Sequence, residues 1–214
     1  TLLDAQTTNG AIDLDHAADA ALVVTTLVTG TGAIQLDQAA AALGQRLTVQ
    51  NAQTTTGNIT LSNTGGANAD VYVDVVTATD DTVRIDADGE IASADVDDGG
   101  AEIAAGTITL DANAGGIGQL NGELEIDATV ALNADTAADS ANITIQDLAG
   151  TLPVGTVTTT ATAGTVTLDA AAGAVTDALA GETANITTQT LVLTALTGIG
   201  SGDELDLAGV NTIT

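Results

Sequence analysis

Gly57-Asn-Ile-Thr-Leu-Ser62 is the stretch that decides the fold, because closely similar phrases return along the whole chain. In each copy a glycine precedes two aliphatic residues that are separated by one polar residue. This alternation sends the aliphatic side chains to one face of a strand and the polar ones to the other. The clear copies begin at Gly10, Gly32, Gly57, Gly106 and Gly164, and weaker copies surround Ile85, Ile143, Leu191 and Ile213.

The spacing of these phrases is nearly constant. Their first aliphatic residues lie about 22 to 25 residues apart, except for one step of about 35 residues between Ile108 and Ile143. A period in this range is typical of stacked repeat architectures. We expect the long step to hold an enlarged turn or a protruding loop, with bends at Gly115-Gly116 and Asn121-Gly122.

A second strand pattern follows about 10 to 16 residues after these copies, so each repeat holds at least two strands. It occurs at Leu22–Val24, Leu47–Val49, Val71–Val73, Leu124–Ile126 and Leu205–Leu207. Hairpin signals are sparse, and an equal period favours coils in which equivalent strands stack in parallel about 4.8 Å apart. The sequence therefore predicts an all-β fold, a parallel β-solenoid of about nine turns of roughly 22 to 25 residues, as one continuous domain over residues 1–214.

The apolar composition agrees with a thin, regular core. Hydrophobic residues make up 44% of the chain, yet Phe, Trp, Met and Cys are absent and Tyr72 is the single aromatic residue. Small branched side chains suit a narrow interior in which identical layers stack on one another. Because there is no cysteine, disulfide bonds do not stabilise this fold.

The charge balance narrows the range of partners. The net charge is −27, from 29 acidic residues against Arg46 and Arg84. Such a surface repels nucleic acid and anionic lipid, and it favours a salty or calcium-containing medium outside the cell. No stretch of 18 or more apolar residues is present, so we expect no direct membrane insertion. Since the first residue is Thr1, we expect a processed product or an internal segment of a longer polypeptide.

Acidic residues concentrate between Asp80 and Glu102, and carboxylate oxygens are the ligands that Ca²⁺ prefers. The alternative interpretation of such a run is a solvated acidic face. Calcium is the one cofactor that the sequence suggests. The candidate ligands are Asp86, Asp88, Glu90, Asp95, Asp97 and Asp98.

Other motifs have a simpler explanation in the repeat itself. Asn58, Asn142 and Asn185 each begin an Asn-Ile-Thr triplet that matches a glycosylation acceptor, but asparagine is also a good corner residue before an inward isoleucine. The threonines of the segment 156–162 suggest an ice-binding array, although threonine is also an ordinary solvent-facing strand residue.

Enzymatic activity is a weaker alternative, because a polysaccharide-cleaving β-helix would need acidic catalysts together with aromatic or cationic subsites. His16 is the only histidine, and we expect it to be a surface residue. No serine–histidine–acid or cysteine-based constellation is present. We therefore predict that the chain is not an enzyme.

The repeats resemble the Thr-, Ala- and Asp-rich strand-repeat regions of large secreted surface proteins, the filamentous haemagglutinin-like adhesins. The closest stretches are Gly164-Thr-Val-Thr-Leu-Asp-Ala170, Gly173-Ala-Val-Thr-Asp177 and Leu191-Val-Leu-Thr194. The similarity covers most of the chain and is one of composition and rhythm. It implies a right-handed β-helix, an extracellular or cell-surface location, and a role in rods, tips or matrices.

We therefore expect a non-enzymatic extracellular structural protein, the shaft or repeating unit of a filament, adhesin or surface layer. Neither end of the chain resembles a polar capping turn, which predicts continuation into further repeats or end-to-end self-association. A cell-surface or polysaccharide ligand is compatible with this role. The alternatives are a calcium-dependent binding module of an adhesin, a polysaccharide-cleaving β-helix enzyme and an ice-binding solenoid.

Overall fold

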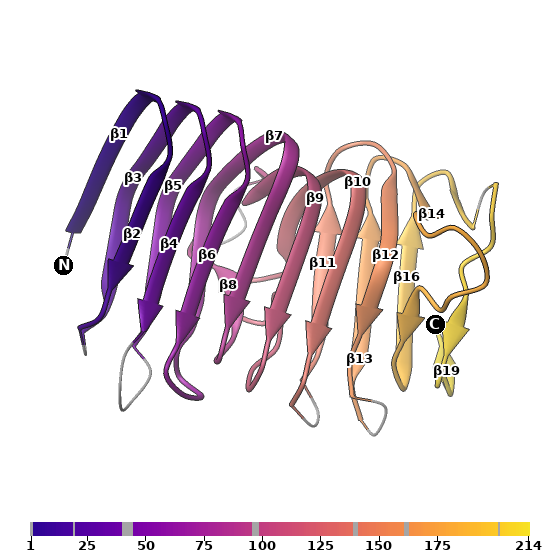
Figure 1. Cartoon of the computed structure of the whole chain (residues 1–214). Coiled ribbons are helices and arrows are strands. Elements are labelled where there is room, and N and C mark those ends of the chain that lie inside the picture. Colours follow the sequence, from indigo (N-terminus) through magenta and orange to yellow (C-terminus); the bar gives the residue numbers. More distant parts are fainter. Residues whose placement is uncertain are drawn as a thin grey trace.

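The computed structural model shows a parallel β-solenoid of about eight turns, which confirms the predicted fold class (Figure 1). It describes residues 2–18, 20–39, 45–95, 99–138, 141–160, 163–200 and 202–214. Within these residues all the regular structure is strand, and every pairing between strands is parallel.

The strands belong to one continuous hydrogen-bonded sheet that is wound into a coil. They are β1 (Leu2–Asn9), β2 (Ile12–His16), β3 (Leu22–Thr31), β4 (Ile34–Ala39), β5 (Leu47–Thr56), β6 (Ile59–Thr64), β7 (Val71–Ala87), β8 (Ile91–Ser93), β9 (Ile103–Ala112), β10 (Leu124–Thr136), β11 (Ile143–Asp147), β12 (Leu152–Thr158), β13 (Thr165–Ala170), β14 (Ala174–Asp177), β15 (Ile186–Thr187), β16 (Thr190–Ala195), β17 (Gly198–Ile199), β18 (Leu207–Ala208) and β19 (Thr212–Ile213).

Each turn contributes segments to three stacks, one more than the two strand patterns visible in the sequence. The first stack begins with β2, β4 and β6, and the second begins with the opening residues of β1, β3, β5 and β7. The third begins with the later residues of β1 and continues through the later residues of β3 and β5. Long strands such as β7 bend around the corners, where their pairing register shifts.

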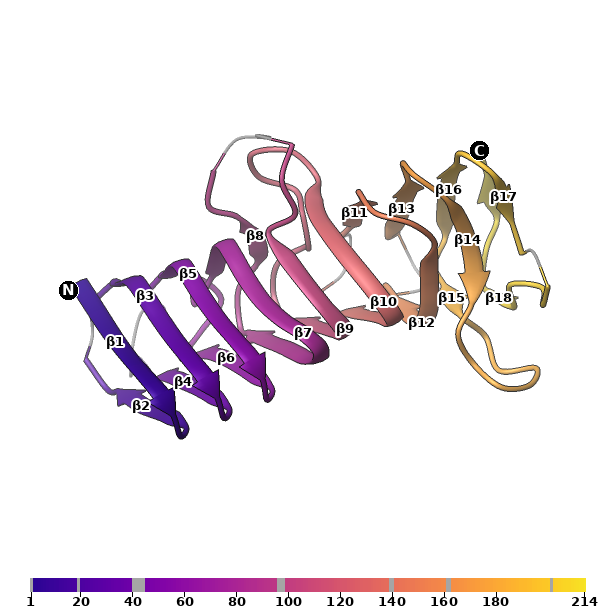
Figure 2. The same cartoon turned by 90° about the horizontal axis from the view of Figure 1, so that it is seen from above.

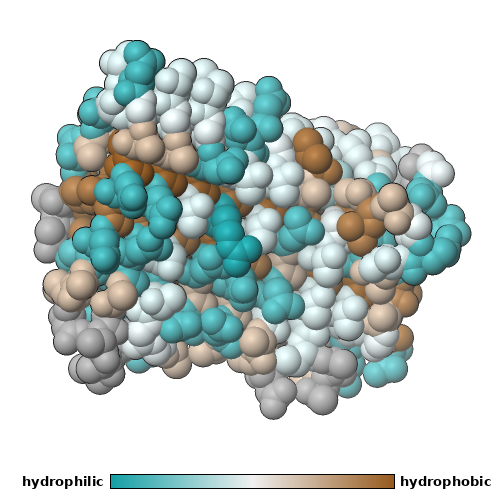
Figure 3. Space-filling model, in the orientation of Figure 1, coloured by the Kyte–Doolittle hydropathy of each residue, from teal (hydrophilic) through white to brown (hydrophobic). Residues whose placement is uncertain are grey.

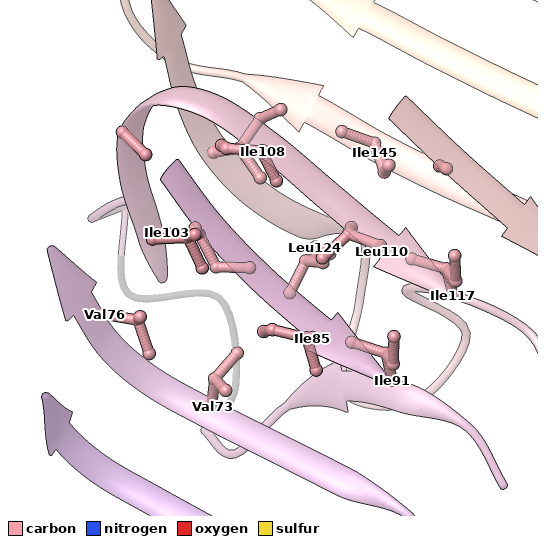
Figure 4. Packing of buried hydrophobic residues seen from close by; sticks show 14 of the residues in the cluster. Val73, Val76, Ile85, Ile91, Ile103, Ile108, Leu110, Ile117, Leu124 and Ile145 are labelled. Atoms are coloured by element: carbon pink, nitrogen blue, oxygen red, sulfur yellow. The ribbon is translucent and has the colours of Figure 1, made fainter. Parts of the chain in front are cut away.

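The core consists of aliphatic columns, because in-register pairing places each inward side chain on its equivalent in the next turn. Ile34 pairs with Ile12 and with Ile59, and Ile34 and Ile59 are almost fully buried. Figure 4 shows the same packing further along the rod, where Ile85, Ile108 and Leu124 point into the interior. Burial of about 25 cal/mol per Å² of apolar surface makes these columns the main source of stability.

The long step between Ile108 and Ile143 does not hold an enlarged turn, which is one of the two structures that the sequence predicts. The other, a protruding loop, is present between β9 and β10 (Figure 2). Ile108 pairs with Leu132 in the first stack, whereas Ile143 pairs with Val166 and forms a bridge with Ile117 in the second stack. The strong repeat phrase therefore changes from the first stack to the second at this point. An ordinary turn fills the step, and its member of the first stack, Leu132, lacks the preceding glycine.

The predicted bend at Asn121-Gly122 is confirmed, because both residues adopt positive φ angles of 67° and 114°. This bend lies in the segment between β9 and β10, which projects from the rod (Figure 2).

Candidate functional surface

A row of carboxylates runs along the outside of the first stack. The aspartate that ends the repeat phrase points outward, and parallel pairing places its equivalents on consecutive turns. Neighbouring positions in such a row are about 4.8 Å apart. The row comprises Asp15, Asp37, Asp86, Asp111 and Asp135, and it is interrupted by Ser62 between Asp37 and Asp86.

Arg84 neutralises part of this row. Its Nε donates a hydrogen bond of 2.8 Å to Asp86 Oδ2, and its guanidinium lies 3.9 Å from Asp111. All three side chains are partly exposed, so these ion pairs contribute little to stability. They nevertheless hold the positive charge of Arg84 between two turns of the carboxylate row.

A shallow groove of about 370 Å³ lies beside Arg84, where Asp111 and Asp135 are paired in register. Burial raises the pKa of Asp135, and the negative charge of Asp111 raises it further. Asn133 and Thr156 line the same groove, and Asn133 Oδ1 accepts a hydrogen bond from the Thr156 backbone N–H at 3.0 Å. The groove therefore offers carboxylates, one cation, an amide and hydroxyl groups.

The predicted calcium ligands have separate structural roles where the structure describes them. Asp86 belongs to the carboxylate row. Asp88 accepts hydrogen bonds from the backbone N–H groups of Gly65 and Gly66, at 2.8 and 3.3 Å, and from Asn113. These bonds, led by the one from Gly65, lower the pKa of Asp88, so this carboxylate is a structural cap at a corner.

Glu90 faces a different neighbour. It accepts a hydrogen bond from the Tyr72 hydroxyl, while Arg46 lies 4.9 Å from the centre of the Tyr72 ring. Burial and this bond to Glu90 raise the pKa of Tyr72 to about 12. The single aromatic residue thus joins the chain's other arginine to a carboxylate instead of filling the core.

Asp95 lies next to Ser93, whose hydroxyl donates a hydrogen bond of 2.8 Å to the Asp95 carbonyl. Asp97 and Asp98 lie outside the described residues. Across the described part of the chain, no three His, Asp or Glu side chains are placed to hold a metal ion together. Calcium binding stays a prediction of the sequence.

Three carboxyl groups are buried among the described residues, and the sequence analysis does not identify them as buried. Glu102, Glu125 and Asp147 are at most 4% exposed. Glu102 accepts hydrogen bonds from Ser93 Oγ at 3.1 Å and from the Glu125 backbone N–H at 2.6 Å. Burial raises the pKa of Glu102 to about 7 and that of Asp147 to about 6.

The three Asn-Ile-Thr triplets differ in accessibility. Asn185 is fully buried, and its Nδ2 donates to the Val154 carbonyl at 2.9 Å and to Asp177 at 2.5 Å. Asn58 is exposed, and its Oδ1 accepts a hydrogen bond from the Thr82 backbone N–H at 3.1 Å. The corner role is therefore clearest at Asn185, whose amide would be inaccessible to a glycosylating enzyme in the folded chain.

The last described turn leaves the apolar columns open. Ile199, Leu207 and Ile213 end the three stacks and are 50%, 40% and 64% exposed. Together with Leu191 and Leu205 they line a hollow of about 490 Å³. Figure 3 shows apolar, brown atoms toward both ends of the rod, while hydrophilic and near-neutral atoms cover most of the face in view.

Comparison of the chain with protein-family models, curated proteins and solved structures gave no significant match. None of the described residues belongs to a helix long and apolar enough to cross a lipid bilayer.

Proposed function

We propose that this chain is a segment of a non-enzymatic structural rod, the shaft or repeating unit of an extracellular filament, adhesin or surface layer. The observation that carries this proposal is the continuous apolar core. One cluster of buried aliphatic residues extends from Ile12 to Leu191 without a break between domains. Stacked columns and turn-to-turn hydrogen bonds resist bending and extension, which is what a shaft requires.

The surface chemistry supports an extracellular setting. A net charge of −27 keeps rods apart and soluble, and cations in the medium screen the carboxylate row. The repeats add to this support, because their composition and rhythm resemble those of secreted surface proteins.

The two ends of the rod support the proposal of self-association or of further repeats. At the first turn, β1 and β2 are paired on one side only, with β3 and β4. At the last turn, Ile199, Leu207 and Ile213 are exposed around the apolar hollow. Unpaired strand edges and open columns favour a further turn, and further repeats or a second copy of this chain would supply it.

Electron microscopy and sedimentation velocity at several salt and calcium concentrations test the self-association. The wild-type chain should form elongated end-to-end particles, and Leu207→Asp should remain monomeric because it places a charge in the hollow. Val130→Asp is the matched control, since Val130 is 59% exposed but belongs to β10 in the middle of the rod. Dispersed monomers of the wild-type chain under every condition would exclude a filament of identical subunits.

The groove beside Arg84 favours a second candidate function, polysaccharide binding or cleavage. Its paired carboxylates, Asp111 and Asp135, and the raised pKa of Asp135 are features of sites that transfer protons to sugars. Incubation with acidic and neutral polysaccharides should release reducing or unsaturated ends if this candidate is correct, and Asp135→Asn should abolish the release. Absence of products, together with absence of binding, would leave the structural role alone.

A further inference from the structure

Among the described residues, buried carboxyl groups are confined to the middle of the rod. Within the described residues, the buried polar side chains of the other turns are neutral, for example Thr54, Asn63 and Thr188. By contrast, Glu102, Glu125 and Asp147 follow one another on three consecutive turns. The Glu102 backbone N–H bonds to the Glu125 carbonyl, and the next residue of β10, Ile126, pairs with Asp147.

The surroundings of these groups supply hydrogen bonds but no positive charge. Glu102 faces Ser93 of β8 and Glu125 of β10, and the charge of Glu125 disfavours its ionisation. Asp147 accepts a bond from the Ala149 N–H at 2.9 Å and faces Asp127 of β10, whose charge acts in the same direction. Asp147 Oδ2 is buried and has no hydrogen-bond partner among the described residues.

The basic side chains of the chain are placed elsewhere. Arg46 lies over Tyr72, Arg84 is paired with Asp86, and His16 is at the end of β2. Ionising a carboxyl group in a water-poor interior without a counter-ion is costly. Local opening of the turn avoids that cost, because it brings the carboxylate into contact with water.

We propose that the turns formed by β8 to β11 are a pH-sensitive joint, closed in mildly acidic solution and locally opened in alkaline solution. Opening is favoured at high pH because the opened turns bind fewer protons than the closed turns. Closed turns hold the protons of Glu102 and Asp147 up to about pH 7 and about pH 6, whereas opened turns release them near 4.5 and 3.8. Between its pKa in the opened turn and its pKa in the closed turn, each group raises the equilibrium constant for opening by up to about tenfold per pH unit. This inference does not depend on the function of the rod.

Hydrogen exchange followed by mass spectrometry at pH 5 and pH 8 tests the joint, after correction for the intrinsic pH dependence of exchange. In the wild-type chain, amide protection of β9, β10 and β11 should fall by about tenfold or more at pH 8, while that of β5 and β6 should stay constant. Equal loss of protection along the whole chain would overturn the proposal, because general charge repulsion would then be the cause.

Variants separate the buried groups from the surface charge. Glu102→Gln and the double variant Glu102→Gln/Asp147→Asn keep the side-chain shapes but cannot ionise at the substituted positions. The pH effect on β9 to β11 should therefore shrink in the first and shrink further in the second, in which Glu125 is the buried carboxyl group that remains. Asp13→Asn is the matched control, since it removes one charge from an exposed position, and it should behave as the wild type. An undiminished pH effect in the double variant would overturn the proposal. If the double variant does not fold, the comparison of β5 and β6 with β9 to β11 in the wild-type chain still decides.

Discussion

The backbone of Gly32 lies directly on that of Gly10 in the preceding turn, so that a Cβ atom on Gly32 would come within 2.6 Å of the Gly10 carbonyl carbon. Both glycines have positive φ angles, 127° and 124°. The repeat therefore needs glycine at this corner for two reasons, the left-handed backbone and the close approach of the preceding turn.

Gly32→Ala should lower the free energy of unfolding by about 3 kcal/mol or more, because backbone strain of about 1–3 kcal/mol is added to a steric clash. Gly10→Ala is the control, since Gly10 has the same backbone conformation but a methyl group there would meet no other atom within 4 Å. The free energy of unfolding of Gly10→Ala should fall only by the backbone strain of about 1–3 kcal/mol. Urea unfolding of both variants measures the difference, and equal losses would show that stacking does not select glycine.

Leu36→Ala should destabilise the rod by about 2–5 kcal/mol. Leu36 is fully buried, and it pairs in register with Leu14 and Leu61, so the truncated side chain leaves a cavity between two layers. Leu196→Ala is the control, because Leu196 is 70% exposed. Its urea midpoint should differ little from that of the wild type. A small effect at Leu36 would contradict the stacked-column core.

Global stability should decrease from about pH 5 to pH 8. Glu102 and Asp147 have raised pKa values of about 7 and about 6 in the folded chain, so the stability linked to their protonation is complete below their unfolded pKa values. It is lost as the pH rises through 6 and 7. Urea midpoints across this range give the slope, and Glu102→Gln should reduce it. A wild-type midpoint that rises steadily toward pH 8 would contradict the prediction.

Asp88→Asn should destabilise the corner at neutral pH by about 1 kcal/mol, since charge-assisted bonds to the N–H groups of Gly65 and Gly66 become ordinary ones. The lowered pKa of Asp88 reverses the sign of the pH effect described for Glu102. Its stabilisation is present above the ordinary aspartate pKa and is lost as the pH falls below it. The difference between wild type and variant should therefore vanish in strong acid, and a difference that persists there would contradict this role.

The period of the phrase around Ile34 and Ile59 is enough to predict the solenoid, because a spacing of one turn and an alternation of one strand are both visible in a single chain. The change of stack after Ile108 is not visible in the same way. An inward Ile-x-Leu pair looks the same in either stack, and Leu132 lies in a segment without the glycine that marks the earlier copies. Which segments pair is decided by the whole turn, not by the local phrase.

The positions of some candidate residues can be predicted from strand alternation, whereas those of others cannot. The outward position of Asp111 and Asp135 follows from alternation, whereas Glu125 lies between Leu124 and Ile126 at a position that alternation assigns to solvent. Its burial results from packing of segments distant in the sequence, as does the separation of Asp88 from Glu90 into unrelated contacts.

The transfer of the repeat phrase between stacks divides the rod into two halves that are not interchangeable. A unit duplicated among the turns whose corners are Gly10, Gly32 and Gly57 can be inserted among its own kind without disturbing its neighbours, since its glycine corner meets another glycine corner. The same unit placed beyond Ile143, with its phrase in the first stack, would lie against β12, β15 or β18, which lack that phrase. Growth or shortening of this chain by whole units is therefore confined to each half, and the turn around Leu132 is the adaptor between them.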